Sequence, residues 1–323
     1  MKNYRMVALL AVFALLVALV PASFAQDMTF GLSQDDFNAL TAATTATASA
    51  TSAQFTFTTS LIASAEGSSG SLDLTGTGAF DSAAGVFQLS IDGSADMGDG
   101  SGETPLTAEL RVVDGSLYAQ VPAMLGPQWL EVTPEELGQM TEGMTASLPF
   151  SPDALASGDM SGMEGMEGMS EVMMALATLQ PEQYIAMTRN GDQFTTTLDI
   201  TGLLGSEEIQ TAIRSGIAAN AEQMEESGMT EAEINEMLAN LPAALEGTTV
   251  TLDQYVTDGM ISRVVVDLAL NADPSVMGQE GEAGSFALNF DISLSGYNQP
   301  VTVEVPEGAV LLSEMMGGMS GAQ

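Results

Sequence analysis

Phe286-Ala-Leu-Asn-Phe-Asp-Ile-Ser-Leu-Ser295 is the stretch of sequence that decides the fold. Apolar side chains occupy every second position, and small or polar side chains occupy the positions between them. Successive side chains of a β-strand point to opposite faces, so this stretch predicts a strand with one apolar and one polar face. Such strands are typical of antiparallel sheets that bury one face and expose the other.

The same alternation recurs along the chain on both sides of this stretch. It is found at residues 55–61, 72–80, 87–91, 110–113, 117–121, 129–132, 194–200, 249–253, 264–270 and 301–305. Asp114-Gly115 and Asp258-Gly259 lie between neighbouring stretches and favour two-residue hairpin turns, which need residues that tolerate a positive φ. The sequence therefore predicts about ten antiparallel strands, each with one apolar face.

Helices are expected before and between the two groups of strands. Ser33, followed by Asp35 and Asp36, has the pattern of a helix N-terminus, with a capping hydroxyl and acidic residues in the first turn. That helix should run to about residue 52. Further helices are expected from Pro134 and at residues 171–179, 206–220 and 230–241. Separate runs of strands and helices predict an α+β fold, with helices across the concave face of a curved antiparallel sheet.

The organisation into domains follows from the need to cover the apolar face. Residues 26–310 are expected to form one domain, because neither strand group has enough helix beside it to cover its own face. Within this domain, the Gly-, Met- and acid-rich residues 158–169 are expected to form a loop. Residues 311–323 are expected to be a flexible tail.

The N-terminus has the pattern of a secretory signal peptide. Lys2 and Arg5 precede an apolar stretch at residues 6–20, and small residues at Ser23 and Ala25 predict cleavage after residue 25. The alternative, an uncleaved anchor helix, would be short for a bilayer span. We expect the protein to be exported, in a periplasm, outside the cell or at the cell envelope, with no stable transmembrane anchor after cleavage.

Composition excludes several classes of function. The 323 residues include 43 acidic and 6 basic side chains, a net charge of −37, and neither histidine nor cysteine. The negative electrostatic field of such a chain repels nucleic-acid phosphates, so no nucleic-acid partner is expected. Imidazole and thiolate chemistry is impossible, and after signal cleavage no lysine remains for Schiff-base chemistry. Paired carboxylates, as in glycoside hydrolases, would remain, but the sequence favours no pair. We expect no catalysis and no cofactor.

One acidic segment has a spacing related to that of a calcium loop. Asp92, Ser94, Asp96 and Glu103 occupy positions 1, 3, 5 and 12 of that spacing. Position 6, where the loop needs a glycine, is Met97. The alternative interpretation is a polar hairpin loop.

Methionines are concentrated before and within the Gly-rich loop. Met is flexible and polarisable, so it forms surfaces that repack around varied apolar partners. We expect Met140, Met144, Met173 and Met174 to line an apolar site, and the methionines of residues 158–169 to belong to a linker. A copper site of thioethers alone is not expected.

A twisted sheet of about ten strands, covered by few and short helices, can leave an apolar cavity. A fully packed core of the same residues would produce the same periodicity. The sequence pattern alone leaves these alternatives open.

Three further segments resemble a known family. These are Arg111-Val-Val-Asp-Gly-Ser-Leu-Tyr-Ala-Gln-Val-Pro122, Gln128-Trp-Leu-Glu-Val132 and Leu294-Ser-Gly-Tyr-Asn-Gln-Pro-Val-Thr-Val-Glu-Val-Pro306. They resemble the corresponding strands of the LolA/LppX/LprG superfamily of lipoprotein and lipid carriers. The resemblance implies an antiparallel half-barrel closed by helices around a hydrophobic cavity that carries a lipid or a lipidated protein.

The leading hypothesis is a non-enzymatic carrier or binding protein for a lipid or another apolar ligand. The sheet side of its site would consist of Phe55, Phe57, Phe87, Leu89, Ile91, Leu110, Val112, Val264, Val266, Leu268, Phe286, Leu288, Phe290 and Ile292. Trp129 and Tyr118 would lie at the mouth, with a core position as the alternative for Trp129. The competing hypotheses are a cell-surface structural or interaction module with a packed core and an acidic exterior, and a hydrolase with paired carboxylates.

Overall fold

The computed structural model describes residues 29–65, 68–98, 100–138, 180–219, 239–272 and 284–315. The predicted signal peptide, the loop at 158–169, the helix at 171–179 and most of the helix at 230–241 lie outside these residues. No helix in the described ranges is both long enough and apolar enough to cross a membrane.

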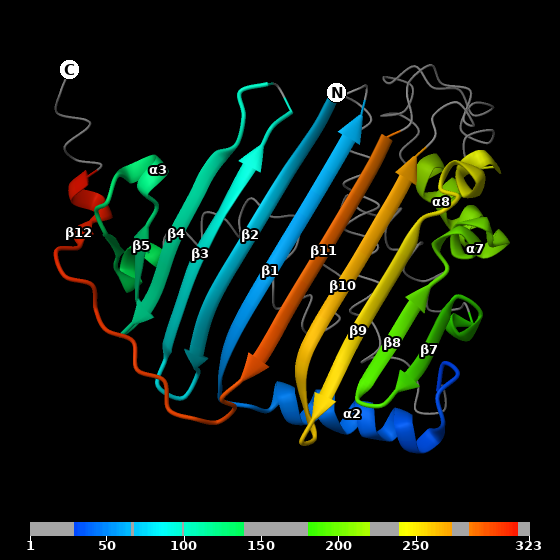
Figure 1. Cartoon of the computed structure of the whole chain (residues 1–323), viewed down its shortest axis with the longest axis horizontal. Helices are drawn as coiled ribbons and strands as arrows, with labels where there is room; N and C mark the ends of the chain where they lie inside the picture. Colours follow the sequence, from blue (N-terminus) through cyan, green and yellow to red (C-terminus); the bar gives the residue numbers. More distant parts are fainter. Residues whose placement is uncertain are drawn as a thin grey trace.

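Twelve strands form one sheet (Figure 1). They are β1 (Ser52–Ala65), β2 (Ser68–Asp81), β3 (Val86–Asp96), β4 (Thr104–Val113), β5 (Ser116–Gln120), β6 (Leu130–Val132), β7 (Ile185–Asn190), β8 (Gln193–Leu198), β9 (Thr249–Thr257), β10 (Met260–Ala272), β11 (Gly284–Ser295) and β12 (Val310–Leu311). Their order is β12-β6-β5-β4-β3-β2-β1-β11-β10-β9-β8-β7. Only the pairing of β12 with β6 is parallel among these strands. The predicted α+β half-barrel is confirmed as an open, mostly antiparallel sheet, with twelve strands instead of about ten.

The two groups of strands join where β1 pairs with β11. The register places Phe57 opposite Ile292, and the pairing runs from Gln54 to Ser64 of β1. Within each group, most neighbouring strands in the sheet are also neighbours in the sequence. The predicted hairpin turns are confirmed, since Asp114-Gly115 and Asp258-Gly259 all have positive φ.

Helices lie against the apolar face at both ends of strands β7–β11. Helix α2 (Gln34–Ala48) begins at the predicted N-cap Ser33 and crosses behind the ends of β9 and β10 in Figure 1. Its Leu40 and Ala43 are buried with Phe194 and Ile261 of the sheet. At the other end, α7 (Ile200–Gly205) and α8 (Glu207–Ala219) bury Leu203, Leu204 and Ile209 against Leu198, Val250, Leu268 and Leu270.

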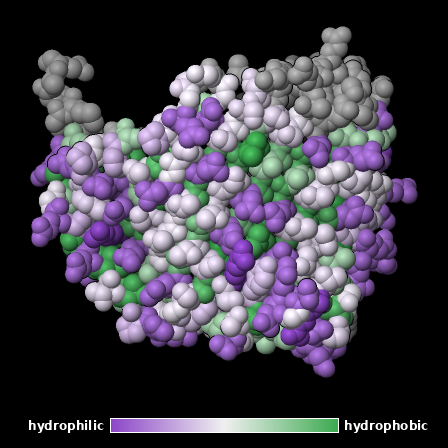
Figure 2. All heavy atoms as spheres, viewed as in Figure 1, coloured by the Kyte–Doolittle hydropathy of each residue, from purple (hydrophilic) through white to green (hydrophobic). Residues whose placement is uncertain are grey.

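The polar face carries a smaller core of its own. The chain leaves β11 and crosses this face below the ends of β1–β4 (Figure 1). Val303 of the crossing segment is buried against Val113 and Tyr118. Apart from this cluster, hydrophilic and weakly polar residues cover most of the face, with scattered apolar residues among them (Figure 2).

Several element boundaries differ from the sequence-based expectation. Residues 301–305 are not a strand. An extended segment lying on a sheet turns every second side chain toward it, so it has the same alternation as a strand. The strand predicted at 194–200 ends at Leu198, because Asp199 caps α7 by accepting a hydrogen bond from the backbone N–H of Gly202 at 2.8 Å.

Two short connecting elements and the last described residues complete the fold. Helix α3 (Pro122–Leu125) and the 3₁₀ turn η3 (Pro181–Gln183) connect strands. Within the predicted tail, Leu311 pairs with Glu131 in the sheet and residues 312–315 are helical.

Candidate functional site: the apolar face of the sheet

The strand register aligns the apolar residues of nine strands into rows that cross the sheet. One row contains Ala108, Ile91, Gly76, Phe57, Ile292 and Val264, and the next contains Leu106, Gly93, Leu74, Thr59, Phe290, Val266 and Leu252. Residues directly opposite each other on paired strands share a face. The pairings of β1–β5 and β8–β11 therefore place all fourteen predicted sheet residues of the site on one face.

Helices cover only part of this face within the described ranges. From the half-buried residues of this face that belong to neither helix-covered cluster, we select twelve on β1–β4, β10 and β11 and call them the central apolar surface. They are Phe55, Phe57, Leu61, Leu72, Leu74, Leu89, Ile91, Leu106, Leu110, Val266, Phe290 and Ile292. The central apolar surface thus extends across β1–β4, β10 and β11 as a continuous band.

Two phenylalanines of the central apolar surface lie across glycines of β2. A Cβ atom at Gly76 would lie 2.3 Å from the ring of Phe57, and one at Gly78 would lie 2.3 Å from the ring of Phe55. The rings therefore lean sideways over the neighbouring strand and occupy the space that a side chain would take. Because β2 has no side chain at these two positions, the apolar surface over β2 stays close to the backbone.

Aromatic pairs continue this packing on either side. The ring centroids of Phe57 and Phe290 are 6.2 Å apart, and those of Phe55 and Phe87 are 6.4 Å apart. Both separations lie in the range of favourable aromatic contacts. Phe rings from β1, β3 and β11 consequently form one apolar patch at the centre of the sheet.

Other predicted site residues are part of the packed clusters. Leu268 is only 3% exposed and lies under α7 and α8, where Phe286 and Leu288 also pack. Val264 packs against the cluster of α2. Val112 and Phe87, which pair at the β4 side of the face, are half-buried and belong to neither cluster. The predicted list thus combines residues that stabilise the fold with residues of the central apolar surface.

The structure places Tyr118 and Trp129 away from the mouth of the predicted site, and for Trp129 this agrees with the alternative of a core position. Both pack with Val303 on the opposite face of the sheet. The guanidinium of Arg111 lies 4.8 Å from the centre of the Trp129 ring. Tyr118 is buried and donates a hydrogen bond to Glu131, and burial followed by the nearby Glu131 charge raises the pKa of its hydroxyl. The sequence contained the necessary signal, because Leu130 faces the apolar side and its neighbour Trp129 must face away.

The remaining predicted residues do not form a metal or methionine site in the described ranges. Met140, Met144, Met173 and Met174 lie outside them. Asp92, Ser94 and Asp96 are on strand β3, where same-face residues are about 6.6 Å apart, too widely spaced for a calcium loop. Glu103 is exposed in the segment before β4. No group of three potential acidic ligands is found among the described residues.

Charged groups of the described sheet are arranged as local pairs. Arg263 donates two hydrogen bonds to Asp291, at 2.9 and 2.5 Å, and Arg189 pairs with Asp36. The hydrogen bonds from Arg263 lower the pKa of Asp291, and those from Ser33 and then Arg189 lower the pKa of Asp36. A general acid needs a raised carboxyl pKa, whereas the pKa values of Asp291 and Asp36 are lowered.

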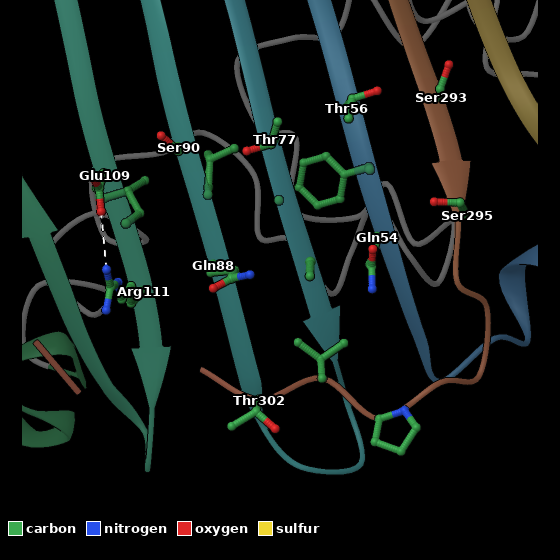
Figure 3. Close-up of a pocket in the computed structure, with 17 residues that line it drawn as sticks. Gln54, Thr56, Thr77, Gln88, Ser90, Glu109, Arg111, Ser293, Ser295 and Thr302 are labelled. Atoms are coloured by element: carbon green, nitrogen blue, oxygen red, sulfur yellow. Dashed lines mark hydrogen bonds and ion pairs between the residues drawn. The ribbon is translucent and has the colours of Figure 1, made fainter. Parts of the chain in front are cut away.

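The sequence-based interpretation missed a groove on the polar face. A cavity of about 500 Å³ lies between strands β11, β1, β2, β3 and β4 and the crossing segment at Pro300–Thr302 (Figure 3). A second cavity of about 440 Å³ lies farther along β1, β2 and β3. Their Ser, Thr and Gln residues occupied the polar positions of the alternation, which predicts exposure to solvent but not a concave shape.

The chain matches no protein-family model and no curated protein. Its structure is similar to that of LprF from Mycobacterium bovis, at 14% identity and a TM-score of 0.31, covering 85% of this chain and 99% of LprF. It is also similar to lipovitellin, at 6% identity and a TM-score of 0.31, covering 79% of this chain and 26% of lipovitellin. A β-barrel-like DUF1849 protein from Brucella abortus has 10% identity and a TM-score of 0.18, covering 76% of this chain and 98% of that protein.

The resemblance of the sequence to the LolA/LppX/LprG superfamily stays a prediction.

Proposed function

We propose that the protein is an exported, non-enzymatic carrier or binding protein for a lipid or another apolar ligand. The observation that carries the proposal is the central apolar surface, whose twelve side chains are half-buried and belong to no buried cluster of the described residues. Continuous apolar surface of this extent on a soluble protein is typical of an interaction or ligand site.

The chemistry of the surface favours an apolar chain over a charged ligand. Its members offer methyl, methylene and aromatic groups, with the hydroxyl of Thr59 between Leu74 and Phe290. Each methylene of a ligand removed from water contributes about 0.8 kcal/mol, so an acyl chain can bind without an ion pair. A polar head group would remain in water, away from the apolar rows.

The first experiment asks whether the protein carries a lipid. The purified protein is extracted with organic solvent and analysed by mass spectrometry, and the delipidated protein is titrated with a fluorescent fatty acid. We expect a co-purified lipid and saturable uptake of the probe. Absence of both would contradict the proposal and favour a cell-surface module with a packed core.

A matched pair of variants tests whether the central apolar surface is the site. Ile91→Glu introduces a charge into this surface on β3, and Thr107→Glu introduces the same charge on the opposite face of β4. We expect Ile91→Glu to weaken probe binding at least about tenfold, since an acyl chain would desolvate the carboxylate. Thr107→Glu should bind as the unmodified protein does. Equal binding by both variants would place the site elsewhere.

A further inference from the structure

The groove on the polar face is lined by neutral hydrogen-bonding side chains. They come from strands β1, β2, β3 and β11 and from the crossing segment, and Figure 3 shows them along the same strands. The neutral polar members are Gln54, Thr56, Thr77, Gln88, Ser90, Ser293, Ser295 and Thr302. The cavity volume of about 500 Å³ lies within the range of small-ligand sites.

These eight side chains are not used to hold the fold together. In the described part of the chain, none of them makes a hydrogen bond to another protein group. Hydroxyl and amide groups each provide both donors and acceptors. The groove therefore presents a set of free donors and acceptors at fixed positions on a rigid sheet.

The charged residues of the groove neutralise each other. Arg111 contacts Glu109 at 3.3 Å and donates a hydrogen bond to the backbone carbonyl of Glu304 at 3.0 Å. Because its guanidinium is used in this way, the groove offers no free cation to an anionic ligand. The net charge of −37 further disfavours anions, while the single paired carboxylate of the lining is a poor cation site.

We propose that this groove binds a neutral saccharide chain. Sugar hydroxyls are donors and acceptors at once, so they match the free hydroxyl and amide groups without requiring charge. An apolar ligand would leave those groups desolvated and unpaired, which is unfavourable. The crossing segment at Pro300–Thr302 forms one wall of the binding site.

The second cavity indicates a ligand longer than one sugar unit. It is lined by Thr58, Thr75 and Asp92, which are the next same-face residues after Thr56, Thr77 and Ser90 on the same three strands. The polar track from Gln54 to Ser60 of β1 spans about 20 Å at the rise of a β-strand. A linear oligosaccharide lying along β1 would contact both cavities.

The two proposed sites are on opposite faces of a single sheet. Saccharide binding can therefore be measured independently of lipid binding, and either proposal can fail without the other. Isothermal titration of the purified protein with cellotetraose, maltotetraose and mannotetraose should show saturable binding of at least one. Tetragalacturonic acid, which has similar hydroxyls but four carboxylates, should bind much more weakly.

A double variant tests the groove itself. Gln54→Ala with Gln88→Ala removes two exposed amides from the lining, and Gln128→Ala removes an exposed amide outside it. We expect the double variant to bind the tetrasaccharide roughly tenfold more weakly, the equivalent of two hydrogen bonds, and Gln128→Ala to bind it unchanged.

Three outcomes would overturn the assignment. They are no binding of any neutral tetrasaccharide at millimolar concentration, preferential binding of the acidic one, and equal affinity of the double variant and the control. Binding to vesicles that carry digalactosyl lipid, without binding to free tetrasaccharides, would also overturn the assignment. The groove would then recognise a lipid head group in a membrane.

Discussion

Gly76 shows how a single missing side chain shapes the candidate site. Its Cα lies beneath the ring of Phe57, and the backbone carbonyl of Ser90 is 2.8 Å from the position that a Cβ atom would take. The glycine permits the aromatic ring to lie across β2, so the centre of the sheet is apolar and still shallow. Gly78 has the same relation to Phe55.

Adding one methyl group at this position should destabilise the protein. In Gly76→Ala the new Cβ would overlap the Phe57 ring and the Ser90 carbonyl, so the ring must move. We expect a loss of about 1–3 kcal/mol in the free energy of unfolding, measured by urea denaturation. Gly138→Ala is the control, because no atom lies within 4 Å of its Cβ position and the helix there prefers alanine. Equal stability of both variants would contradict the packing described.

At this scale, the sequence predicts on which face a residue lies but not how it packs. The alternation correctly placed Phe55, Phe57 and Ile91 on the apolar face. It did not separate Leu268, which is buried under helices, from Phe290, which is half-buried. That difference depends on where α2, α7 and α8 lie, and no local pattern contains this information.

Single elements of the fold were predictable where their signals are local. Helix α2 begins at Ser33, whose hydroxyl accepts a hydrogen bond from the Asp36 N–H, as the capping pattern predicted. Strand β11 coincides with the longest alternation, at residues 286–295, and β10 contains the alternation at 264–270. Strand β7 was missed because its apolar residues do not alternate regularly, and β12 because two residues are too few to form a pattern.

The pair of Arg263 and Asp291 links β10 to β11 on the polar face, and its contribution should depend on pH. The pKa of Asp291 is lowered by the hydrogen bonds from Arg263. A carboxyl group whose pKa is lower in the folded than in the unfolded state stabilises the protein at pH values above the ordinary carboxyl range, about pH 4. This contribution is lost as the pH falls through the folded-state pKa. The pair is partly exposed, with 26% of the Asp291 side chain accessible, so it is worth on the order of 0.5–1 kcal/mol.

Asp291→Asn should therefore be less stable than the unmodified protein at neutral pH, and this difference should shrink as the pH falls below the ordinary carboxyl range, about pH 4. The measurement is the unfolding temperature of both proteins between pH 2.5 and 7. Asn289→Asp is an unsuitable control because Asn289 donates to Asp267, whereas Ser295→Asn, on the same strand and face and opposite Gln54 of β1, is suitable. A constant difference at all pH values would show that the ion pair is not the cause.

At the scale of the whole molecule, the excess of carboxylates opposes the folded state. With a net charge of −37, like charges are closer together in the folded protein than in the unfolded chain. Three described arginines, Arg111, Arg189 and Arg263, are each paired with one carboxylate, which leaves most acidic residues unbalanced. The fold is therefore stabilised by its apolar face and its strand pairing against electrostatic repulsion.

Salt should consequently stabilise this protein. Raising sodium chloride from about 0.01 M to 1 M shortens the screening length from about 30 Å to 3 Å. We expect the unfolding temperature to rise by several degrees, because repulsion is screened more than the few ion pairs are weakened. Choline chloride should have the same effect, since the cause is ionic strength. A fall in unfolding temperature with both salts would mean that the ion pairs outweigh the repulsion.

The position of β1 beside β11 also has a consequence for biosynthesis. The backbone N–H of Thr51, at the start of β1, is held by the side chain of Asn298, 247 residues farther along the chain. A polypeptide emerging from a ribosome or a secretion channel with its N-terminus first must keep one edge of β1 unpaired until β11 has followed. Pairings between such distant segments form slowly. The centre of the sheet can therefore be completed only after β11 has been synthesised, when most of the chain already exists.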